Sequence, residues 1–225
     1  MTDRASAYPL RTARKHSTRA ALVDAAAELF VRKGIDVATL DEVAAHAGMH
    51  VQTLYRHFPN KAALAQAIEL RYLERFRERI EDPARTEDTL TFWRNWVETA
   101  AREVTERDGG RGYRAAIQQR FSATAVPGNL LASWFEYEEL LAKSLARDLG
   151  VHPDEDPRPR LIACALWAGN VNAARRWVMS EKPGQSLSAA CVAVVDGVVS
   201  LMGGQALRTA KKTTSSRASV ARRRR

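Results

Sequence analysis

The stretch Thr39–Phe58 reads as two short helices joined by a turn that contains glycine, and this pattern constrains the fold most. Thr39 is followed three residues later by Glu42, the spacing of a capping box, which predicts that a helix begins there. Gly48 predicts the end of that helix, since glycine readily takes the left-handed backbone found at helix C-termini. A second short helix then runs to Phe58. Two such helices are typical of a helix-turn-helix, whose second helix enters the DNA major groove.

Helix signals flank this motif on both sides. Ser17 or Thr18 is a suitable N-cap for a first helix, so residues 1–16 would precede that helix. This segment carries basic side chains and is expected to be a flexible arm, either without a specific role or reaching the minor groove or phosphates. Beyond the motif, Asn60 is the expected cap of a long helix that continues to about residue 82.

The rest of the chain shows only further helical patterns. Apolar residues recur every three to four positions, and proline or glycine stands at the junctions between segments. No stretch keeps the alternation of a strand for long. We therefore expect an all-α protein of about nine helices, with a second helical domain over residues 83–207.

The positive charge is concentrated in the last residues. The formal net charge is +9, and segment 208–225 holds eight basic side chains and no acidic one. Because this segment lacks apolar periodicity, we expect a disordered tail, either without a specific role or attracting DNA by counterion release. The rest of the chain is close to neutral, so the net positive charge of the whole chain says little about the folded part.

Composition and motifs argue against several classes of protein. Two cysteines, Cys164 and Cys191, are too few for a disulfide framework or a zinc cluster and are expected to be buried free thiols. The N-terminus lacks the apolar region of a signal peptide, and no apolar run approaches a membrane span, so a cytoplasmic protein is expected. We find no catalytic motif, phosphate-binding loop or paired metal ligands, and expect no enzyme activity, cofactor or metal.

Residues 18–64 resemble the N-terminal domain of the tetracycline-repressor (TetR) family. The marks are AAAELF followed by a glycine, then TLDEVAAHAG, then TLYRHFPNK and a leucine, in this order. The resemblance implies a DNA-binding domain over residues 17–64, followed by a helical domain that binds a ligand and forms a homodimer. Where many members have Ser-Lys-Gly, at the start of the second motif helix, this chain has His50, Val51 and Gln52. Family-average base contacts are therefore not carried over.

The outward face of the second motif helix carries polar side chains suited to DNA. Gln52 can pair with adenine and Arg56 with guanine at major-groove edges, whereas Tyr55 suits phosphate contacts. His50 is a further candidate for base reading, and Thr53 suits either role. The alternative is a three-helix bundle whose polar face is merely solvated. The resemblance implies phosphate contacts at Thr39, Tyr55, His57 and Lys61.

Tryptophan is frequent in the helical remainder, where it indicates either core packing or the wall of a ligand site. The resemblance implies an inducer site inside this second domain. Segment 134–177 also resembles the C-terminal domain of the mycofactocin-regulator-like subgroup, which does not identify the ligand. We expect an unknown inducer of apolar or aromatic character. The candidate pocket residues are Trp93, Trp96, Trp134, Tyr137, Trp167 and Asn170.

Small and β-branched residues fill the last two helices and predict close helix packing. The resemblance implies that these helices, two from each subunit, form the interface of a homodimer. Packing against the rest of the same domain is the alternative. A two-fold dimer would present two recognition helices to a palindromic operator. The candidate interface residues are Ala165, Ala168, Gly169, Val194 and Val198.

Together these features predict a ligand-responsive transcriptional repressor that binds double-stranded operator DNA as a homodimer and is released by its inducer. The alternative is an architectural or non-specific DNA-binding protein that acts through the basic arm and tail. The two hypotheses differ in salt dependence and in the choice of DNA site.

Overall fold

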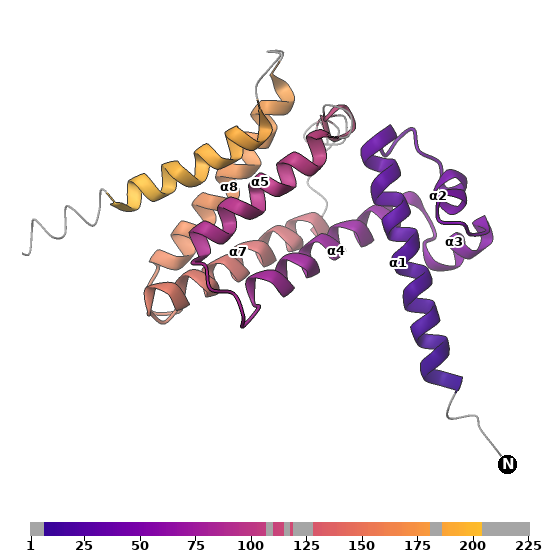
Figure 1. Ribbon diagram of the computed structural model, residues 1–225, viewed down its shortest axis with the longest axis horizontal. Helices are drawn as coiled ribbons and strands as arrows, with labels where there is room; N and C mark the ends of the chain where they lie inside the picture. The colour runs from indigo at the N-terminus through magenta and orange to yellow at the C-terminus, as the bar shows by residue number, and fades with distance from the viewer. Residues whose placement is uncertain (1–6, 107–109, 115–117, 119–127, 181–185, 204–225) are drawn as a thin grey trace, which may run out of the picture. The chain divides into compact units, whose positions relative to one another are not determined.

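Helices account for all the regular structure in the part of the chain that the computed structural model describes, namely residues 7–106, 110–114, 118, 128–180 and 186–203 (Figure 1). No strand occurs among these residues, which confirms the all-α prediction. None of the helices in these ranges is long and apolar enough to cross a membrane. The helices are α1 (Ala7–Lys33), α2 (Leu40–His46), α3 (Val51–His57), α4 (Lys61–Ile80), α5 (Thr89–Glu106), α7 (Gly128–Leu149) and α8 (Arg158–Met179), with further helical residues at 111–114 and 187–203.

The chain divides into two compact units. The first unit comprises Met1–Arg85 and Arg102–Leu140, and the second comprises Thr86–Ala101 and Leu141–Arg225. Helices α5 and α7 therefore each contribute residues to both units. The expected basic tail, residues 208–225, lies outside the described residues.

A single apolar core holds the first four helices of the first unit together. Leu22 and Leu29 of α1 are buried against Val43 of α2, Leu54 of α3 and Leu64 of α4. Leu22, Ala26 and Leu29 of α1 follow one another at four- and three-residue intervals, so one stripe of this helix faces the core. Burial of these core residues fixes which faces of α2 and α3 remain exposed to solvent.

Helix α1 begins at Ala7, well before the Ser17 or Thr18 cap that the sequence suggested. The prediction of a flexible arm over residues 1–16 is therefore wrong for residues 7–16, and residues 1–6 lie outside the described part. Pro9 is compatible with this start because it stands in the first turn, where backbone N–H groups have no partner within the helix. The helix thus extends about ten residues further than expected.

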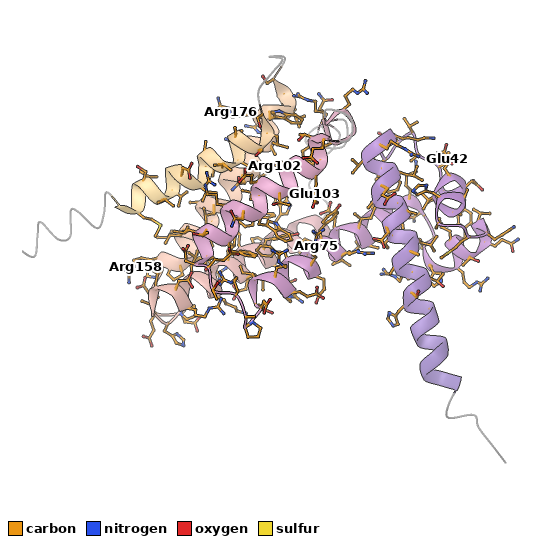
Figure 2. The ribbon with its side chains drawn as sticks, in the orientation of Figure 1. Glu42, Arg75, Arg102, Glu103, Arg158 and Arg176 are labelled. Carbon is orange, nitrogen blue, oxygen red and sulfur yellow. The ribbon has the colours of Figure 1, made fainter. Side chains whose placement is uncertain are left out.

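Helices α5 and α7 each supply a residue of the first unit that contacts α4. The rings of Phe76 and Tyr137 lie 4.9 Å apart between centroids, and both side chains are buried. Burial also raises the pKa of the Tyr137 phenol, which is consistent with an apolar setting. At the surface Arg75 and Glu103, labelled in Figure 2, form an ion pair at 3.7 Å. These contacts hold α4, the long helix that follows the helix-turn-helix, against residues of α5 and α7.

The second unit is organised around a buried polar contact and a pair of tryptophans. Thr89 is fully buried, and its hydroxyl lies 2.7 Å from the hydroxyl of Ser144. The backbone N–H of Thr89 donates to the Asp148 carboxylate at 2.6 Å, so the start of α5 is tied to the end of α7. Trp93 of α5 meets Trp167 of α8 with ring centroids 6.0 Å apart. Buried groups of α5 thus connect it to both α7 and α8.

The two cysteines of the second unit differ in exposure. Cys191 is buried as expected, and burial raises the pKa of its thiol to about 11. Cys164 is only half-buried, so the expectation of two buried thiols holds for Cys191 alone. Neither cysteine forms a disulfide bond.

Candidate nucleic-acid interface

The first motif helix, α2, begins with the predicted capping box. The N–H of Glu42 donates to the Thr39 hydroxyl at 3.2 Å, and the N–H of Thr39 donates to the Glu42 carboxylate at 3.0 Å. The same carboxylate accepts from the ammonium of Lys33 at 2.6 Å, which joins the end of α1 to the start of α2. Glu42 (Figure 2) therefore fixes both the start of α2 and its position against α1.

Replacing Glu42 by glutamine should reduce the dependence of stability on acid pH. The hydrogen bond from Lys33, followed by that from Thr39, lowers the Glu42 pKa from 4.5 to about 2. Because the folded-state pKa is depressed, this contribution is complete above pH 4.5 and is lost as the pH falls from 4.5 towards 2. Urea unfolding between those limits should show a shallower pH slope for Glu42→Gln than for wild type. Equal slopes would contradict the assignment of this pH dependence to Glu42. The control is Asp41→Asn, which removes a neighbouring exposed carboxylate.

Gly48 shapes the turn between α2 and α3. Its φ of 66° lies in the left-handed region, which glycine enters without strain, as the sequence predicted. The N–H of Gly48 donates to the carbonyl of Ala45 at 3.0 Å, and the N–H of Met49 donates to that of Ala44 at 2.8 Å. These bonds satisfy the last carbonyls of α2 and direct the chain into α3.

His50 is the N-cap of α3. Its Nδ1 accepts a hydrogen bond from the N–H of Gln52 at 3.3 Å, so this ring nitrogen is an acceptor and Nε2 remains as a donor. Sequence reasoning missed this role because histidine is not among the residues favoured at N-caps. The cap fixes the His50 ring beside the first turn of the helix. Nε2 is therefore the ring nitrogen that His50 has available for a base edge.

Helix α3 has one buried and one exposed face. Leu54 is fully buried in the core of the first unit, whereas Gln52 and Arg56 are exposed and Tyr55 retains 51% of its accessible surface. Thr53 is half-buried beside them. The structure thus places the predicted polar side chains together on the solvent face of one short helix.

Two further candidates, Thr39 and Lys61, lie at helix starts beside α3. The Thr39 hydroxyl accepts the capping bond from Glu42, which leaves its proton available as a donor. Lys61 is half-buried, and its ammonium donates to the carbonyl of Asp36 at 3.1 Å. An ammonium has three donors, so Lys61 retains others for an anion.

His57, in the last turn of α3, is half-buried and carries a lowered pKa. Burial is the main cause, and the positive charges of Lys15, Arg56 and Arg19 add to it. The ring is therefore held neutral more strongly than an ordinary histidine. A neutral imidazole can still donate one hydrogen bond to a phosphate oxygen.

The candidate pocket residues separate between the two units. Trp93, Trp167 and Asn170 belong to the second unit, where Asn170 follows Trp167 by three residues and lies on the same side of α8. Trp96 stacks on Phe92 in the same unit, with centroids 6.2 Å apart. Trp134 and Tyr137 belong to the first unit. The described contacts therefore bring Trp93 and Trp167 together.

Asn170 is buried within this apolar setting, with 8% of its surface exposed. Its amide nitrogen donates to the carbonyl of Leu166 at 2.9 Å. Its Oδ1 has no hydrogen-bond partner among the described residues. A buried acceptor without a donor is costly, so such an atom is a candidate ligand contact.

The candidate interface residues divide into exposed and internally packed groups. Ala165 and Ala168 are exposed on α8, and Val198 is half-buried on the last helix. Gly169 and Val194 instead face each other within the chain, since a Cβ placed on Gly169 would lie 2.5 Å from Cγ1 of Val194. Glycine thus permits the close approach of the last two helices within one subunit. No group of three metal-ligating side chains occurs among the described residues.

Helices α2 and α3 are both capped and are joined by a turn at Gly48, and α3 exposes one polar face. Together they form a helix-turn-helix, the fold element of a DNA-binding protein. Residues 22–68 match the family model described as bacterial regulatory proteins, tetR family. The chain belongs to the tetR family of transcription regulators, which confirms the resemblance noted in the sequence.

Two curated relatives extend the similarity beyond the matched domain. The transcriptional activator FasR of Mycolicibacterium smegmatis is 30% identical over 167 residues, covering 73% of this chain and 74% of its own. The transcriptional regulator TcmR of Streptomyces glaucescens is 28% identical over 197 residues, covering 84% and 86%. Both are named as transcription regulators rather than enzymes.

A solved structure shows the same fold at lower identity. A tetR-family regulator from Streptomyces coelicolor has a TM-score of 0.63 and 19% identity, covering 86% of this chain and 83% of that one. This likeness concerns the helical architecture alone.

Proposed function

We propose that the chain is a ligand-responsive regulator that binds a palindromic operator as a homodimer and releases it when a small molecule occupies the second unit. The exposed polar face of α3, held in place by buried Leu54, is the observation that carries this proposal. Repression follows wherever the operator overlaps a promoter. FasR, by contrast, is named a transcriptional activator.

Base reading is assigned to the exposed side chains near the start and middle of α3. Gln52 can bond bidentately to adenine, and Arg56 can do so to guanine. His50 can add a bond from Nε2, and Thr53 can contact either a base or a phosphate. Phosphate contacts position the helix without reading sequence. We assign them to Thr39, Tyr55, His57 and Lys61.

Dimerisation is assigned to the outer face of α8 and the last helix. Leu161, Ala165 and Ala168 follow at four- and three-residue intervals on α8, and all three are exposed, Leu161 by 64%. Leu201 of the last helix is exposed by 75%, and Val198 lies half-buried on that helix. A partner subunit would cover this apolar surface and would present a second α3 related by two-fold symmetry.

The ligand is assigned to the surroundings of Trp93, Trp167 and Asn170. Aromatic walls favour a flat or apolar molecule, and the Asn170 Oδ1 favours one that carries a hydroxyl, amide or amine donor. A Thermus thermophilus tetR-family repressor, FadR, with a TM-score of 0.55 and 21% identity, was solved with lauroyl-CoA. The match covers 80% of this chain and 93% of the FadR chain.

Selection of bound fragments from genomic DNA by the purified full chain tests operator binding. We expect enrichment of a palindromic sequence and a complex that contains two subunits for each operator. Fragments without a shared sequence would instead favour the architectural alternative. Deleting residues 208–225 separates the two hypotheses, since sequence-specific binding should survive the deletion. If specific binding vanished while the fold survived, the helix-turn-helix account would be wrong.

A thermal-shift screen tests ligand binding, scored by whether the same compound releases operator DNA. Coupling between the two sites requires that each ligand weaken the other by the same factor. Asn170→Ala should reduce the affinity for donor-bearing compounds by about tenfold, a loss typical of one buried hydrogen bond. For a matched compound lacking the donor, the affinity should change little. Equal losses for the two compounds would contradict the role of Asn170.

A further inference from the structure

We propose that Lys15 and Arg19, on the N-terminal part of α1, bind the DNA phosphate backbone beside the groove that α3 enters. Lys15 and Arg19 belong to α1 and are not among the base and phosphate contacts assigned above. The inference rests on the proposed DNA binding by α3, and it adds a second contact made by a different helix.

The geometry of α1 places both cations on one side of a rigid element. Lys15 and Arg19 are four residues apart in a continuous helix, so they share one face, and both are exposed. Within the first unit, Figure 1 shows that α1 continues well past α2 and α3 towards the N-terminus. Because Lys15 and Arg19 stand in the same continuous helix whose later turns pack in the core, the fold positions both cations relative to that core.

The cations lie beside the C-terminal end of α3. The Arg19 guanidinium lies over the ring of Phe58, 4.9 Å from its centroid, and Phe58 is the C-cap of α3. The lowered pKa of His57 reports the same proximity, since Lys15, Arg56 and Arg19 contribute to it after burial. Two helices therefore bring their positive charges together, and we call Lys15, Arg19 and Arg56 the α1–α3 basic cluster.

Lys15 and Arg19 differ from Lys33 and Arg71 of the same unit, which are paired with carboxylates. Lys33 pairs with Glu42 at 2.6 Å, and Arg71 pairs with Asp24 at 2.5 Å. Among the described residues, no carboxylate forms an ion pair with Lys15 or Arg19. Like charges held together without counter-charges repel one another, so an external anion is favoured at this cluster.

DNA phosphate is the anion that this position selects. The cluster adjoins the helix that the fold presents to the major groove, and backbone phosphates border that groove. Exposed lysine and arginine bind phosphates with little dependence on base sequence. The contact should therefore strengthen binding on every sequence and extend the protected backbone beyond the half-site read by α3.

The full-length double variant Lys15→Gln/Arg19→Gln tests the inference, measured on the selected operator and on random DNA over a range of salt concentrations. Each lost phosphate contact should reduce the slope of log K against log salt by about 0.9, or about 3.6 for a dimer that loses four contacts. Affinity should fall at least tenfold on both DNAs, with the preference for operator unchanged. The control Arg32→Gln/Arg79→Gln removes two exposed charges elsewhere in the unit and should leave the slope at the wild-type value.

An unchanged slope in the Lys15/Arg19 variant, or one matching that of the control, would overturn the inference. If wild type showed no operator preference, the proposed function itself would fail, which is a distinguishable outcome. If removal of Arg19 impaired folding through its contact with Phe58, the single variant Lys15→Gln would test the inference by itself. It should lower the slope by about 1.8 per dimer. Backbone protection outside the half-site should weaken in the same variant.

Discussion

Leu54→Ala is expected to destabilise the first unit by about 2–5 kcal/mol and to abolish operator binding at moderate temperature. Leu54 is fully buried, and it is the residue through which α3 is anchored in the core beside Val43 and Leu64. Truncation leaves a cavity under a helix of only seven residues, which is too short to be stable without packing. The exposed face of α3 would then lose its fixed orientation towards DNA.

Hydrogen exchange across residues 40–58, together with urea unfolding, measures this loss. Amides of α2 and α3 should exchange much faster in Leu54→Ala than in wild type. Tyr55→Ala is the matched control, since Tyr55 is half-exposed and its removal should alter stability by about 0.5 kcal/mol or less. Wild-type protection in Leu54→Ala would contradict the view that core packing holds the recognition helix.

Gly169→Ala is expected to destabilise the second unit, although alanine favours helices over glycine. The added Cβ would lie 2.5 Å from Cγ1 of Val194, a β-branched side chain with little rotameric freedom. Overpacking of this kind costs about 1–3 kcal/mol, which outweighs the gain of up to about 1 kcal/mol in helix propensity. Because α8 and the last helix carry the proposed dimer surface, the dimer should also be weaker and should dissociate at a higher protein concentration than the wild-type dimer.

Gly197→Ala provides the matched control, since a Cβ at Gly197 meets nothing within 4 Å. It should raise stability by about 0.5–1 kcal/mol through helix propensity alone. Combining Gly169→Ala with Val194→Ala should recover part of the loss, because the crowding methyl is removed. Equal melting temperatures for the two glycine variants would show that Gly169 is not required for this close approach.

Local signals in the sequence were sufficient to predict the helix-turn-helix. The capping box at Thr39, the turn at Gly48 and the cap at Asn60 all act within a few residues, and all three are confirmed. The buried stripes that follow them determine which face of each helix is exposed. The polar face of α3 could therefore be predicted before the fold was known.

Other features could not be predicted because they depend on weak or long-range interactions. The segment before Ser17 is polar and carries no apolar stripe that would predict a helix, yet α1 begins at Ala7, and its first turn tolerates Pro9. The pairing of Trp93 with Trp167 joins distant parts of the chain. Small residues such as Gly169 indicated that α8 packs closely against another helix. Composition alone does not reveal whether that helix belongs to the same chain or to another subunit.

The preference for operator over random DNA, compared among wild type, Gln52→Ala and Tyr55→Ala, tests the central claim most directly. Wild type should bind the operator at least about a thousandfold more tightly than random DNA of the same length and salt. Gln52→Ala should reduce this ratio by about tenfold or more, since one bidentate base contact contributes about 1–3 kcal/mol of discrimination. Tyr55→Ala should weaken binding to both DNAs alike and preserve the ratio. Equal losses on operator and random DNA for Gln52→Ala would contradict sequence reading by the exposed face of α3.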